Sequence, residues 1–447
     1  MYIKIPERWK EAKIIILFKK GDRKEIKNYR SISLLAHTYK LFTRLLQQRM
    51  EKDLDDNQPR EQAGFRKGFS TRDHLQSLNI TIEKCNEFNK PLCVCFIDYE
   101  KAFDSVEHFS VFNALRKMKI NETYVNILEN IYKEATARVH LDDHVSGAFQ
   151  IERGVRQGDP ISPKLFTAAI EEIFKKTNLK DGILIDDEHL KDLRFADDVA
   201  LLTTDSEKME KHLQLLNEES RKIGLKIHKG KTKFMTNYVN KRAIKMEGEE
   251  IEEVDDYKYL GQVISPSQHT DLELNSRIRA AWSCFGKNRE ILLDKEIPTS
   301  LKTKVLNMCV LPAMTYGCET WALTSKQMTR IRSTQRAMER RMLSIKLLDK
   351  IPHREIHQTI KAIDAPKFIM RQKWRWAGHV GRFQDNRWTK KCTDWTPPGR
   401  RRPGRPKRRW IDDIKEGVGD DWKDIAADRD EWRAATEGFI QQWVYNA

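Results

Sequence analysis

The segment LRFADDVALL, residues 193–202, places two aspartates, Asp197 and Asp198, between two apolar runs. The runs read as two strands that meet at the acidic pair, which is typical of a β-hairpin with its turn at these residues. Neighbouring carboxylates repel each other and lose hydration beside buried strands. Such a pair therefore requires compensation by a cation, by a basic side chain or by protonation.

A second apolar run, LCVCFID at residues 92–98, ends on Asp98. Cys93 and Cys95 alternate on one face of this expected strand, and we interpret them as core thiols. Carboxylates at the ends of separate strands can converge on one point, and three clustered carboxylates form a hard-oxygen site that suits Mg²⁺. Taken alone, the acidic pair stays open to a second interpretation as a solvated loop, because adjacent aspartates are common in loops.

Composition and charge restrict the function classes. The chain has 447 residues, enough for two or three domains, and 82 Lys and Arg against 66 Asp and Glu give a formal net charge of +16. A surplus of this size favours a polyanionic partner. No apolar run approaches the roughly 20 residues of a membrane span, and the N-terminus lacks the apolar region of a secretory signal. We therefore expect an intracellular protein, and the charge alone leaves nucleic acid and an acidic membrane open as the polyanion. With the motifs described below, we expect a protein in the nucleus that binds nucleic acid and no membrane.

Apolar spacing predicts a first half of mixed strands and helices and a mostly helical second half. Strands are expected at 12–18, 92–98, near 149, on both sides of Asp197, and at 257–264. Helices are expected at 34–50, 71–88, 109–118, 123–134, near 165–170 and at 206–223. Residues 275–370 carry helical periodicity with few strand signals.

The C-terminal part differs in composition from the rest of the chain. Eight of the eleven tryptophans lie in the last 74 residues: Trp374, Trp376, Trp388, Trp395, Trp410, Trp422, Trp432 and Trp443. Residues 399–410, GRRRPGRPKRRW, contain six Arg and one Lys and no acid; we call this segment the basic run. The tryptophans indicate partial folding, and a solvated tail is the alternative.

We expect the basic run to contact phosphates while neighbouring aromatic rings stack on bases. The expected nucleic-acid-binding residues are Arg400, Arg401, Arg402, Arg405, Lys407, Arg408 and Arg409. The run also resembles a minor-groove AT-hook or a nuclear import signal, and one short basic run does not decide between these possibilities.

Seven motifs, in order along the chain, resemble those of reverse transcriptases from non-LTR (LINE-type) retrotransposons. Three are similar to the group's palm motifs: FIDYEKAFDSVEH (96–108), GVRQGDPISPKLF (154–166) and FADDVALL (195–202). Two upstream are similar to its fingers and connecting motifs: FKKGDRKEIKNYRSISLL (18–35) and QAGFRKGFSTRDHL (62–75). Two downstream are similar to its last palm segments: GLKIHKGKTKF (224–234) and YKYLGQVI (257–264).

The resemblance implies an α+β right-hand polymerase with fingers, a palm that contains an antiparallel sheet, a helical thumb and a basic Trp-rich C-terminal region. The implied parts are truncated fingers and the fingers–palm connection (1–90), the palm (91–265), the thumb and connection (266–370) and the C-terminal region (371–447). The group usually carries an endonuclease ahead of the polymerase, and this chain starts in the middle of the fingers. We therefore expect a piece of a larger polyprotein or a truncated genomic copy.

The same resemblance implies a metal role for three acids. Asp98 and Asp197 would be the principal ligands of two Mg²⁺ ions, and Asp198 would be a weaker ligand beside them. All three would be catalytic, and metal would then supply the compensation that the acidic pair requires. The implied chemistry is attack of a primer 3′-hydroxyl on the α-phosphate of a deoxynucleotide, with RNA as template and DNA as primer or target.

Nucleotide contacts are also implied. Arg30 matches the fingers arginine that grips the triphosphate, a role suited to a guanidinium. Phe103 occupies the gate position that excludes ribonucleotides, and an ordinary core phenylalanine is the alternative. The remaining members of the implied nucleotide-binding set are Tyr99, Gln157, Gly158 and Lys231.

Three positions in these motifs are less certain matches. Either Lys231 or Lys233 would protonate the leaving pyrophosphate. The group usually has proline where this chain has Ser31, and asparagine where it has His228. The serine loosens the loop but removes no charge, whereas the histidine makes the register near the two lysines less secure.

Two functions follow for the chain as a whole. The first is RNA-directed DNA synthesis, and the second is that of an inactive relic that only binds nucleic acid. RNA-templated RNA synthesis is disfavoured by Phe103 at the gate position. The sequence does not indicate an oligomeric state.

Overall fold

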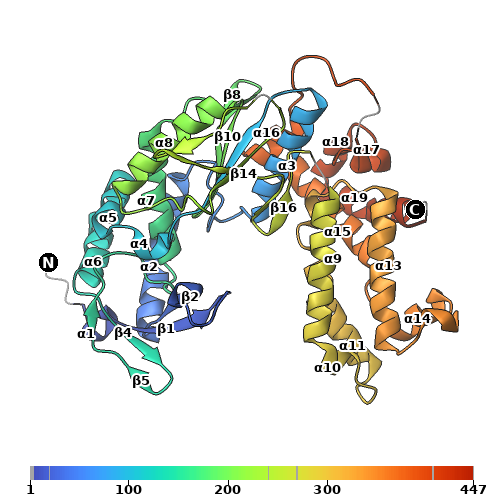
Figure 1. The fold of residues 1–447 in the computed structure, drawn as a ribbon, viewed down its shortest axis with the longest axis horizontal. Coiled ribbons are helices and arrows are strands. Elements are labelled where there is room, and N and C mark those ends of the chain that lie inside the picture. Colours follow the sequence, from blue (N-terminus) through green and yellow to red (C-terminus); the bar gives the residue numbers. More distant parts are fainter. Residues whose placement is uncertain (1–4, 20, 240, 268–269, 405–406, 446–447) are drawn as a thin grey trace. The chain divides into compact units, whose positions relative to one another are not determined.

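The computed structural model describes residues 5–19, 21–239, 241–267, 270–404 and 407–445 (Figure 1). The fold is mixed α+β, as the sequence predicts. The chain forms two units, and each unit combines segments that are distant in sequence. The first unit comprises Met1–Thr71 and Leu92–Glu253, and the second comprises Arg72–Pro91 and Val254–Ala447. The finer division into four parts at residues 90, 265 and 370 stays a prediction.

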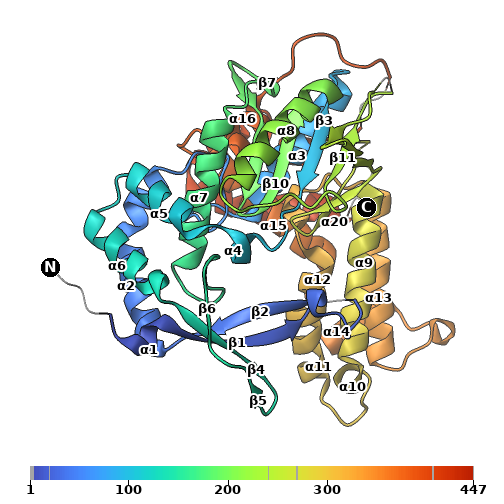
Figure 2. The ribbon, with the colours of Figure 1, turned by 60° about the vertical axis from the view of Figure 1, so that its left-hand side comes forward.

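The first unit is built around a five-stranded sheet with the order β14-β11-β3-β10-β9. Its strands are β3 (Cys93–Ile97), β9 (Asp192–Phe195), β10 (Asp198–Thr203), β11 (Lys233–Thr236) and β14 (Glu252–Glu253). Strand β3 pairs antiparallel with both β10 and β11 (Figure 2), and all five of its residues are buried. Cys93 and Cys95 are 0% exposed, which confirms that they are core thiols.

A second five-stranded sheet in this unit has the order β2-β1-β4-β5, and β6 also pairs with β4. Its strands are β1 (Glu11–Phe18), β2 (Tyr29–Leu34), β4 (Thr136–Leu141), β5 (His144–Val145) and β6 (Phe149–Gln150). Strands β1 and β2 form an antiparallel hairpin, and β4 runs parallel to β1. Two short hairpins complete the strands of this unit: β7 (Ile183–Ile185) with β8 (Glu188–Leu190), and β12 (Lys245–Met246) with β13 (Glu249–Glu250).

Helices α7 and α8 pack against each other, and α8 contacts β3 and β10 of the central sheet. The helices of this unit are α1 (Glu7–Lys10), α2 (His37–Asp56), α4 (Ala102–Ser105), α5 (His108–Lys117), α6 (Glu122–Lys133), α7 (Ser162–Thr177) and α8 (Ser206–Arg221), with a 3₁₀ turn at Ile26–Asn28. Asp205 caps α8 by accepting a hydrogen bond from the backbone N–H of Lys208 at 2.8 Å. The buried face of α8, which includes Met209, Leu213 and Leu216, covers the sheet.

The second unit is mostly helical, which confirms the periodicity of residues 275–370. Its elements are α3 (Thr71–Glu87), β15 (Tyr257–Tyr259), β16 (Gln262–Ile264), α9 (Thr270–Lys287), α10 (Arg289–Leu292), α11 (Thr299–Val305), a π-helical segment (Leu306–Val310), α12 (Leu311–Thr315), a 3₁₀ turn (Cys318–Thr320), α13 (Ser325–Met342), a 3₁₀ turn (Leu347–Asp349), α14 (His353–Ile360), α15 (Ala365–Gly381), α16 (Trp388–Asp394), α17 (Asp412–Val418), α18 (Trp422–Ala427), α19 (Arg429–Ala434) and α20 (Thr436–Tyr445). Helices α9 and α13 lie side by side (Figure 1).

Helix α3 is the segment of the second unit that comes from the N-terminal part of the sequence, and eleven of its seventeen residues are buried. Asp73 forms an ion pair with Arg387 at 3.0 Å. The carboxylate of Glu83 accepts a hydrogen bond from the backbone N–H of Trp410 at 2.9 Å. Periodicity predicts the helix, but its partners lie more than 300 residues further along the chain.

Seven of the eight C-terminal tryptophans are core side chains with no more than 4% exposure: Trp374, Trp376, Trp388, Trp395, Trp410, Trp422 and Trp432. The rings of Trp374 and Trp432 are stacked 3.8 Å apart, and each indole N–H donates to the backbone carbonyl of the other residue at 2.9 and 3.1 Å. The expected folding of this region is confirmed. The expectation that these rings stack on bases is wrong for these seven, because buried rings have no face to offer; the Trp443 side chain lies outside the described residues.

The strand predicted at 257–264 is a hairpin of two short strands, β15 and β16. The chain reverses at Leu260 and Gly261, which both adopt positive φ, 46° and 86°. Two consecutive residues in that region form the tight turn that joins antiparallel strands. Leucine rarely adopts it, so the sequence carries only the glycine as a signal. The other predicted elements are confirmed in kind, with shifted ends. In the described part of the chain, no helix has both the length and the apolarity needed to traverse a bilayer.

Candidate active site

The three predicted acids lie at one end of the central sheet. Val199 of β10 pairs with Ile97 of β3, and the same antiparallel register carried one residue further brings Asp198 opposite Asp98. Asp197 directly precedes β10, in the turn that joins it to β9. Strand pairing therefore gathers carboxylates that are about 100 residues apart in sequence, as the apolar runs predict.

The acids influence one another electrostatically. Loss of surrounding water and then the charges of Asp197 and Asp98 raise the pKa of Asp198 to about 6, against the opposing effect of Lys19. The pKa of Asp197 is also raised, first by burial and then by Asp98, against hydrogen bonding to its own backbone and the charges of Arg30 and Lys19. The cluster is thus only partly compensated by the protein itself.

One lysine contacts the cluster directly. Strand β11 pairs with β3 so that Lys233 lies opposite Phe96, and the turn before β11 brings Nζ of Lys231 to 3.3 Å from Oδ1 of Asp98. The Lys231 side chain is 58% exposed, so this ion pair is weak. Lys233 instead pairs with Glu252 at 2.5 Å. Of the two lysines considered from sequence, Lys231 is the one beside the acids.

The backbone around Asp98 is held by the segment that precedes β11. His228 donates its backbone N–H to the carbonyl of Asp98 at 2.7 Å. The backbone N–H of Asp98 lies 3.5 Å from the hydroxyl of Thr232, at the long limit for a hydrogen bond. The contact made by His228 uses only backbone atoms, so a histidine in place of the group's asparagine leaves it intact.

The β1–β2 hairpin carries the cations that act on Asp197. Arg30 pairs with Leu17 across the hairpin and has an exposed side chain, and Lys19 directly follows β1. Both lower the pKa of Asp197 through their charge. The hairpin therefore places the predicted phosphate-binding arginine within electrostatic range of the predicted metal ligands.

The two aromatic residues after Asp98 have different environments. The ring of Phe103 stacks on Phe166 at 4.3 Å and stays partly exposed, so one face belongs to the core while the rest is accessible. Tyr99 is 5% exposed, and its hydroxyl lies 3.0 Å from that of Ser220. The Tyr99 side chain faces the core, so the expectation that it contacts a nucleotide is not supported by its position.

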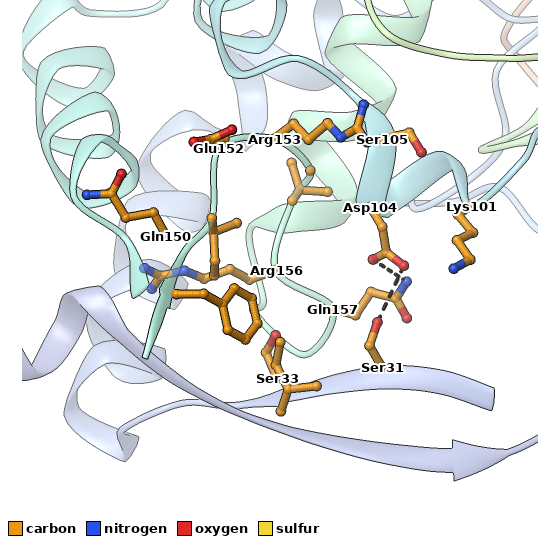
Figure 3. A pocket seen from close by; sticks show the side chains of 15 residues that line it. Ser31, Ser33, Lys101, Asp104, Ser105, Gln150, Glu152, Arg153, Arg156 and Gln157 are labelled. Atoms are coloured by element: carbon orange, nitrogen blue, oxygen red, sulfur yellow. Dashed lines mark hydrogen bonds between the residues drawn. The ribbon is translucent and has the colours of Figure 1, made fainter. Parts of the chain in front are cut away.

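Gln157 lies in the wall of a cavity of about 450 Å³ between the β1–β2 hairpin, α4 and the loop 149–157 (Figure 3). Its Nε2 donates to Oδ1 of Asp104 at 2.9 Å, and the Ser31 hydroxyl donates to Oδ2 at 3.4 Å. Gly158 has φ of 117°, and a Cβ there would lie 2.7 Å from the carbonyl oxygen of Ser33. Only glycine therefore fits between the loop and β2.

Asp104 was not among the residues predicted from sequence. It accepts hydrogen bonds from both Gln157 and Ser31, and burial raises its pKa. The available signal was the departure from proline at Ser31, because a proline has no hydroxyl to donate. The carboxylate connects the β1–β2 hairpin with the loop that carries Gln157.

The ligand requirements of Mg²⁺ bear on the three acids, Asp98, Asp197 and Asp198. In the described ranges, no three His, Cys, Asp or Glu side chains form a ready-made metal cage. Magnesium does not require one, because it usually binds one or two carboxylates and completes its shell with water and substrate phosphates. Asp98, Asp197 and Asp198 offer hard carboxylate oxygens with incomplete charge compensation, so the residues fit this ion.

Most charged side chains of the basic run form ion pairs or hydrogen bonds with other residues of the second unit. Arg401 pairs with Glu87 at 3.0 Å, Arg408 with Asp413 at 2.6 Å and Arg409 with Asp412 at 2.9 Å. Lys407 donates to the backbone carbonyl of Ser267 at 2.8 Å. Arg405 lies outside the described residues.

Two arginines of the run differ from the rest. Arg400 and Arg402 are exposed, and the described part of the chain shows no ion pair for either. The predicted nucleic-acid contacts of the run stay a prediction, and these two side chains are the most accessible candidates.

Comparisons with known proteins agree with the motifs. Residues 18–264 match the model of a family described as "Reverse transcriptase (RNA-dependent DNA polymerase)". The chain is 34% identical over 268 residues to an uncharacterized transposon-derived protein of Caenorhabditis elegans, covering 55% of this chain and 95% of that protein. It is 25% identical over 361 residues to the RNA-directed DNA polymerase from mobile element jockey of Drosophila melanogaster, covering 75% of this chain and 38% of that protein.

The chain is also similar to a retroelement polyprotein and to a solved telomerase structure. The chain is 26% identical over 284 residues to the Pol polyprotein from the type-1 retrotransposable element R2 of Nasonia vitripennis, covering 60% of this chain and 27% of that protein. It therefore spans well under half the length of the jockey and R2 proteins. Among solved structures, apo telomerase from Candida tropicalis aligns with a TM-score of 0.47 at 11% identity, covering 88% of this chain and 70% of that chain.

Proposed function

Because the chain belongs to the reverse transcriptase family and is related to the polymerases of non-LTR retrotransposons, we propose that it copies an RNA template into DNA. The observation that carries the proposal is the gathering of Asp98, Asp197 and Asp198 at one end of the central sheet. Partly compensated carboxylates at that point are what a metal-dependent nucleotidyl transfer requires.

Parts of both units correspond to polymerase subdomains in this proposal. The central sheet would be the palm, and the sheet that contains β1 and β2 would belong to the fingers. Helices α9 to α14 of the second unit would be the thumb. Support comes from the order of the motifs and from the placement of Arg30 on the β1–β2 hairpin within electrostatic range of Asp197.

Asp98, Asp197 and Asp198 would hold the Mg²⁺ ions. Bound Mg²⁺ supplies charge neutralisation at the attacking and leaving oxygens of a phosphoryl transfer. The carboxylates must be ionised to bind it, and a bound cation would favour the ionised form of Asp198, whose pKa is raised to about 6 by burial and then by its acidic neighbours.

The other residues act on the substrates. Arg30 would bind the triphosphate of the incoming deoxynucleotide through its guanidinium. Lys231, which has an exposed ammonium 3.3 Å from Asp98, would give a proton to the departing pyrophosphate. The accessible part of the Phe103 ring would exclude a 2′-hydroxyl. Gln157 and Gly158 would contact the nucleotide and template beside the cavity.

Primer extension on an RNA template tests the proposal. The full chain is incubated with a DNA primer, deoxynucleotides and Mg²⁺, and we expect incorporation that EDTA and Asp197→Asn both abolish. Asp187→Asn, in the exposed turn between β7 and β8, is the matched control and should leave the rate unchanged. If the protein only retards RNA in a gel and extends no primer, it is a relic that binds nucleic acid, and the polymerase proposal is wrong.

Sugar selection tests the gate separately. Phe103→Ala should increase ribonucleotide incorporation relative to deoxynucleotide incorporation, because the ring that faces the 2′ position is removed. Phe166→Leu is the control, since it disturbs the same aromatic stack from the core side. Equal sugar selection in wild type and Phe103→Ala would leave Phe103 as a core residue only.

The remaining assignments are part of the same proposal. RNA template, DNA primer or target and deoxynucleotides would be the substrates, and a nuclear location would follow from copying into genomic DNA. Arg400 and Arg402 would add phosphate contacts outside the active site.

A further inference from the structure

Gln62 contacts the turn that carries the candidate catalytic acids. Its side chain is 0% exposed, and its Oε1 accepts two backbone hydrogen bonds, from Gly64 at 2.8 Å and from Ala196 at 3.1 Å. Ala196 directly precedes Asp197. The amide oxygen of Gln62 therefore fixes the peptide next to the first acid of the pair.

The turn needs such support because of its backbone conformation. Ala196 has φ of 57°, a left-handed conformation that is unfavourable for a residue with a Cβ. Conformations of this kind persist only where the surroundings determine them. The N–H of Ala196 is buried, and Oε1 of Gln62 is its hydrogen-bond acceptor.

The backbone of residues 61–64 also runs alongside strand β9. Gln62 forms a parallel bridge with Arg194, with Ala63 N–H to Arg194 O at 2.9 Å and Arg194 N–H to Glu61 O at 2.8 Å. A Cβ on Gly64 would lie 2.4 Å from the backbone nitrogen of Ala196, so the two segments touch backbone to backbone.

The two ends of the Gln62 amide are not used equally. In the described part of the chain, Nε2 of Gln62 is buried without a hydrogen-bond partner. An unsatisfied buried donor is destabilising, so an apolar side chain would suit the position better if the residue were kept there for packing alone. The oxygen explains why an amide occupies the position.

We propose that Gln62 is a positioning residue, which holds the turn at Ala196 so that Asp197 and Asp198 face Asp98. The structural part of the inference stands on the contacts above, and its kinetic consequence rests on the proposed function. Gln62 touches neither substrate nor metal in this proposal; it acts through the turn.

Two substitutions at Gln62 separate the oxygen from the shape of the side chain. Gln62→Met keeps the length and removes the acceptor, whereas Gln62→Glu keeps an acceptor oxygen and replaces the unpartnered NH₂ by the second oxygen of a carboxyl, which burial favours in its neutral form. Gln58→Met is the matched control: Gln58 is also buried, at 6% exposure, and its Oε1 has no hydrogen-bond partner in the described ranges. Gly64→Ala disturbs the same contact from the backbone side.

Hydrogen exchange measures the contact without any need for activity. We expect the Ala196 amide, within a peptide covering residues 193–198, to exchange about tenfold faster in Gln62→Met, in line with the loss of one hydrogen bond. Gln62→Glu and Gln58→Met should keep the wild-type rate. Unchanged exchange in Gln62→Met, or equal acceleration in Gln58→Met, overturns the inference.

Kinetics measure the consequence for the acids. In primer extension, Gln62→Met and Gly64→Ala should lower kcat by about 10- to 100-fold with the deoxynucleotide KM within twofold of wild type, because the acids are displaced and the nucleotide contacts are not. Gln62→Glu should restore most of kcat. A change in KM alone, or no rescue by Glu, contradicts the positioning role. If wild type shows no polymerase activity, the proposed function fails, while the exchange experiment still decides the structural part. If Gln62→Met does not fold, exchange in Gly64→Ala decides it in the same way.

Discussion

The acidic cluster of the first unit and a buried ion pair of the second unit differ in how the fold compensates their charges. In the first unit, Asp98, Asp197 and Asp198 come together with one exposed lysine in contact and raised pKa values at Asp197 and Asp198. In the second unit, Lys373 and Asp413 are 1% and 2% exposed and form an ion pair at 2.5 Å. Charge that the fold leaves incompletely compensated is available to a ligand, whereas charge that the fold pairs internally is part of the core. The acidic cluster and the Lys373–Asp413 pair therefore differ in whether their charges are paired within the fold, and not in how densely charged they are.

Removing an acid from the first unit should reduce activity without reducing stability. Asp98→Asn takes away a proposed metal ligand and lowers the repulsion within the cluster. We expect primer extension to fall by at least about 1,000-fold, since charge neutralisation by metal contributes several kcal/mol to the transition state. The midpoint of urea unfolding should be equal to wild type or higher. A lower midpoint would place Asp98 among the structural charges.

Removing an acid from the second unit should do the reverse. Asp413→Ala leaves the buried ammonium of Lys373 without its carboxylate, and Arg408 loses the same partner. We expect a loss of about 3–5 kcal/mol in the free energy of unfolding, measured by tryptophan fluorescence in urea. The control Asp420→Ala breaks an exposed pair with Lys415 and should leave the free energy of unfolding almost unchanged. Similar losses in both variants would contradict the contrast.

A buried acid in the second unit should also make stability depend on pH. Burial raises the pKa of Glu83 from 4.5 to about 7. Between these values the folded state binds more protons than the unfolded state, so stability falls as pH rises from about 4.5 to about 7. Glu83→Gln keeps an acceptor for the Trp410 N–H and cannot ionise. We expect it to remove about 1–3 kcal/mol of that pH dependence, measured by urea unfolding at a series of pH values. Identical pH profiles would show that Glu83 titrates normally.

The smallest effect concerns the basic run. Replacing Arg400 and Arg402 together by Ala should weaken binding of single-stranded RNA several-fold and reduce the slope of log affinity against log salt by roughly 1.4. Arg409→Ala removes an arginine that already pairs with Asp412 and Glu87, and should change the slope little. Fluorescence anisotropy over a salt series measures both. Equal slopes for all three proteins would exclude the run as a phosphate contact.

The sequence was most informative where a local pattern determines the structure. The apolar runs around Asp197 and before Asp98 predicted β9, β10 and β3, and the converging strand ends followed from them. Helix α7 and the lysine beside Asp98 were also anticipated, although two lysines remained open until β11 fixed the register. The spacing of apolar residues and the ends of apolar runs are local properties, and a single sequence is enough to show them.

What the sequence could not show depends on partners far along the chain. Clustered tryptophans and arginines have the same composition in a nucleic-acid track as in a folded core, and only the pairing of Trp374 with Trp432 separates the two. The positive φ of Ala196 and Leu260 has no signal in residues that usually avoid it. Gln62 and Asp104 act through contacts with segments 134 and 53 residues away.

Helix α3 also decides where this protein can be divided. The family match ends at residue 264, but α3 lies inside that range and is covered by Arg387, Cys392 and Trp410 from the far end of the chain. A protein shortened at residue 264 would retain α3 with its apolar face uncovered and Asp73 without its arginine. We therefore expect the segment that ends at residue 264 to aggregate when expressed alone and to remain in solution when residues 265–447 are present as well. Loss of the C-terminal region would thus damage the folding of the chain before it affected any contact that the region itself makes with a ligand.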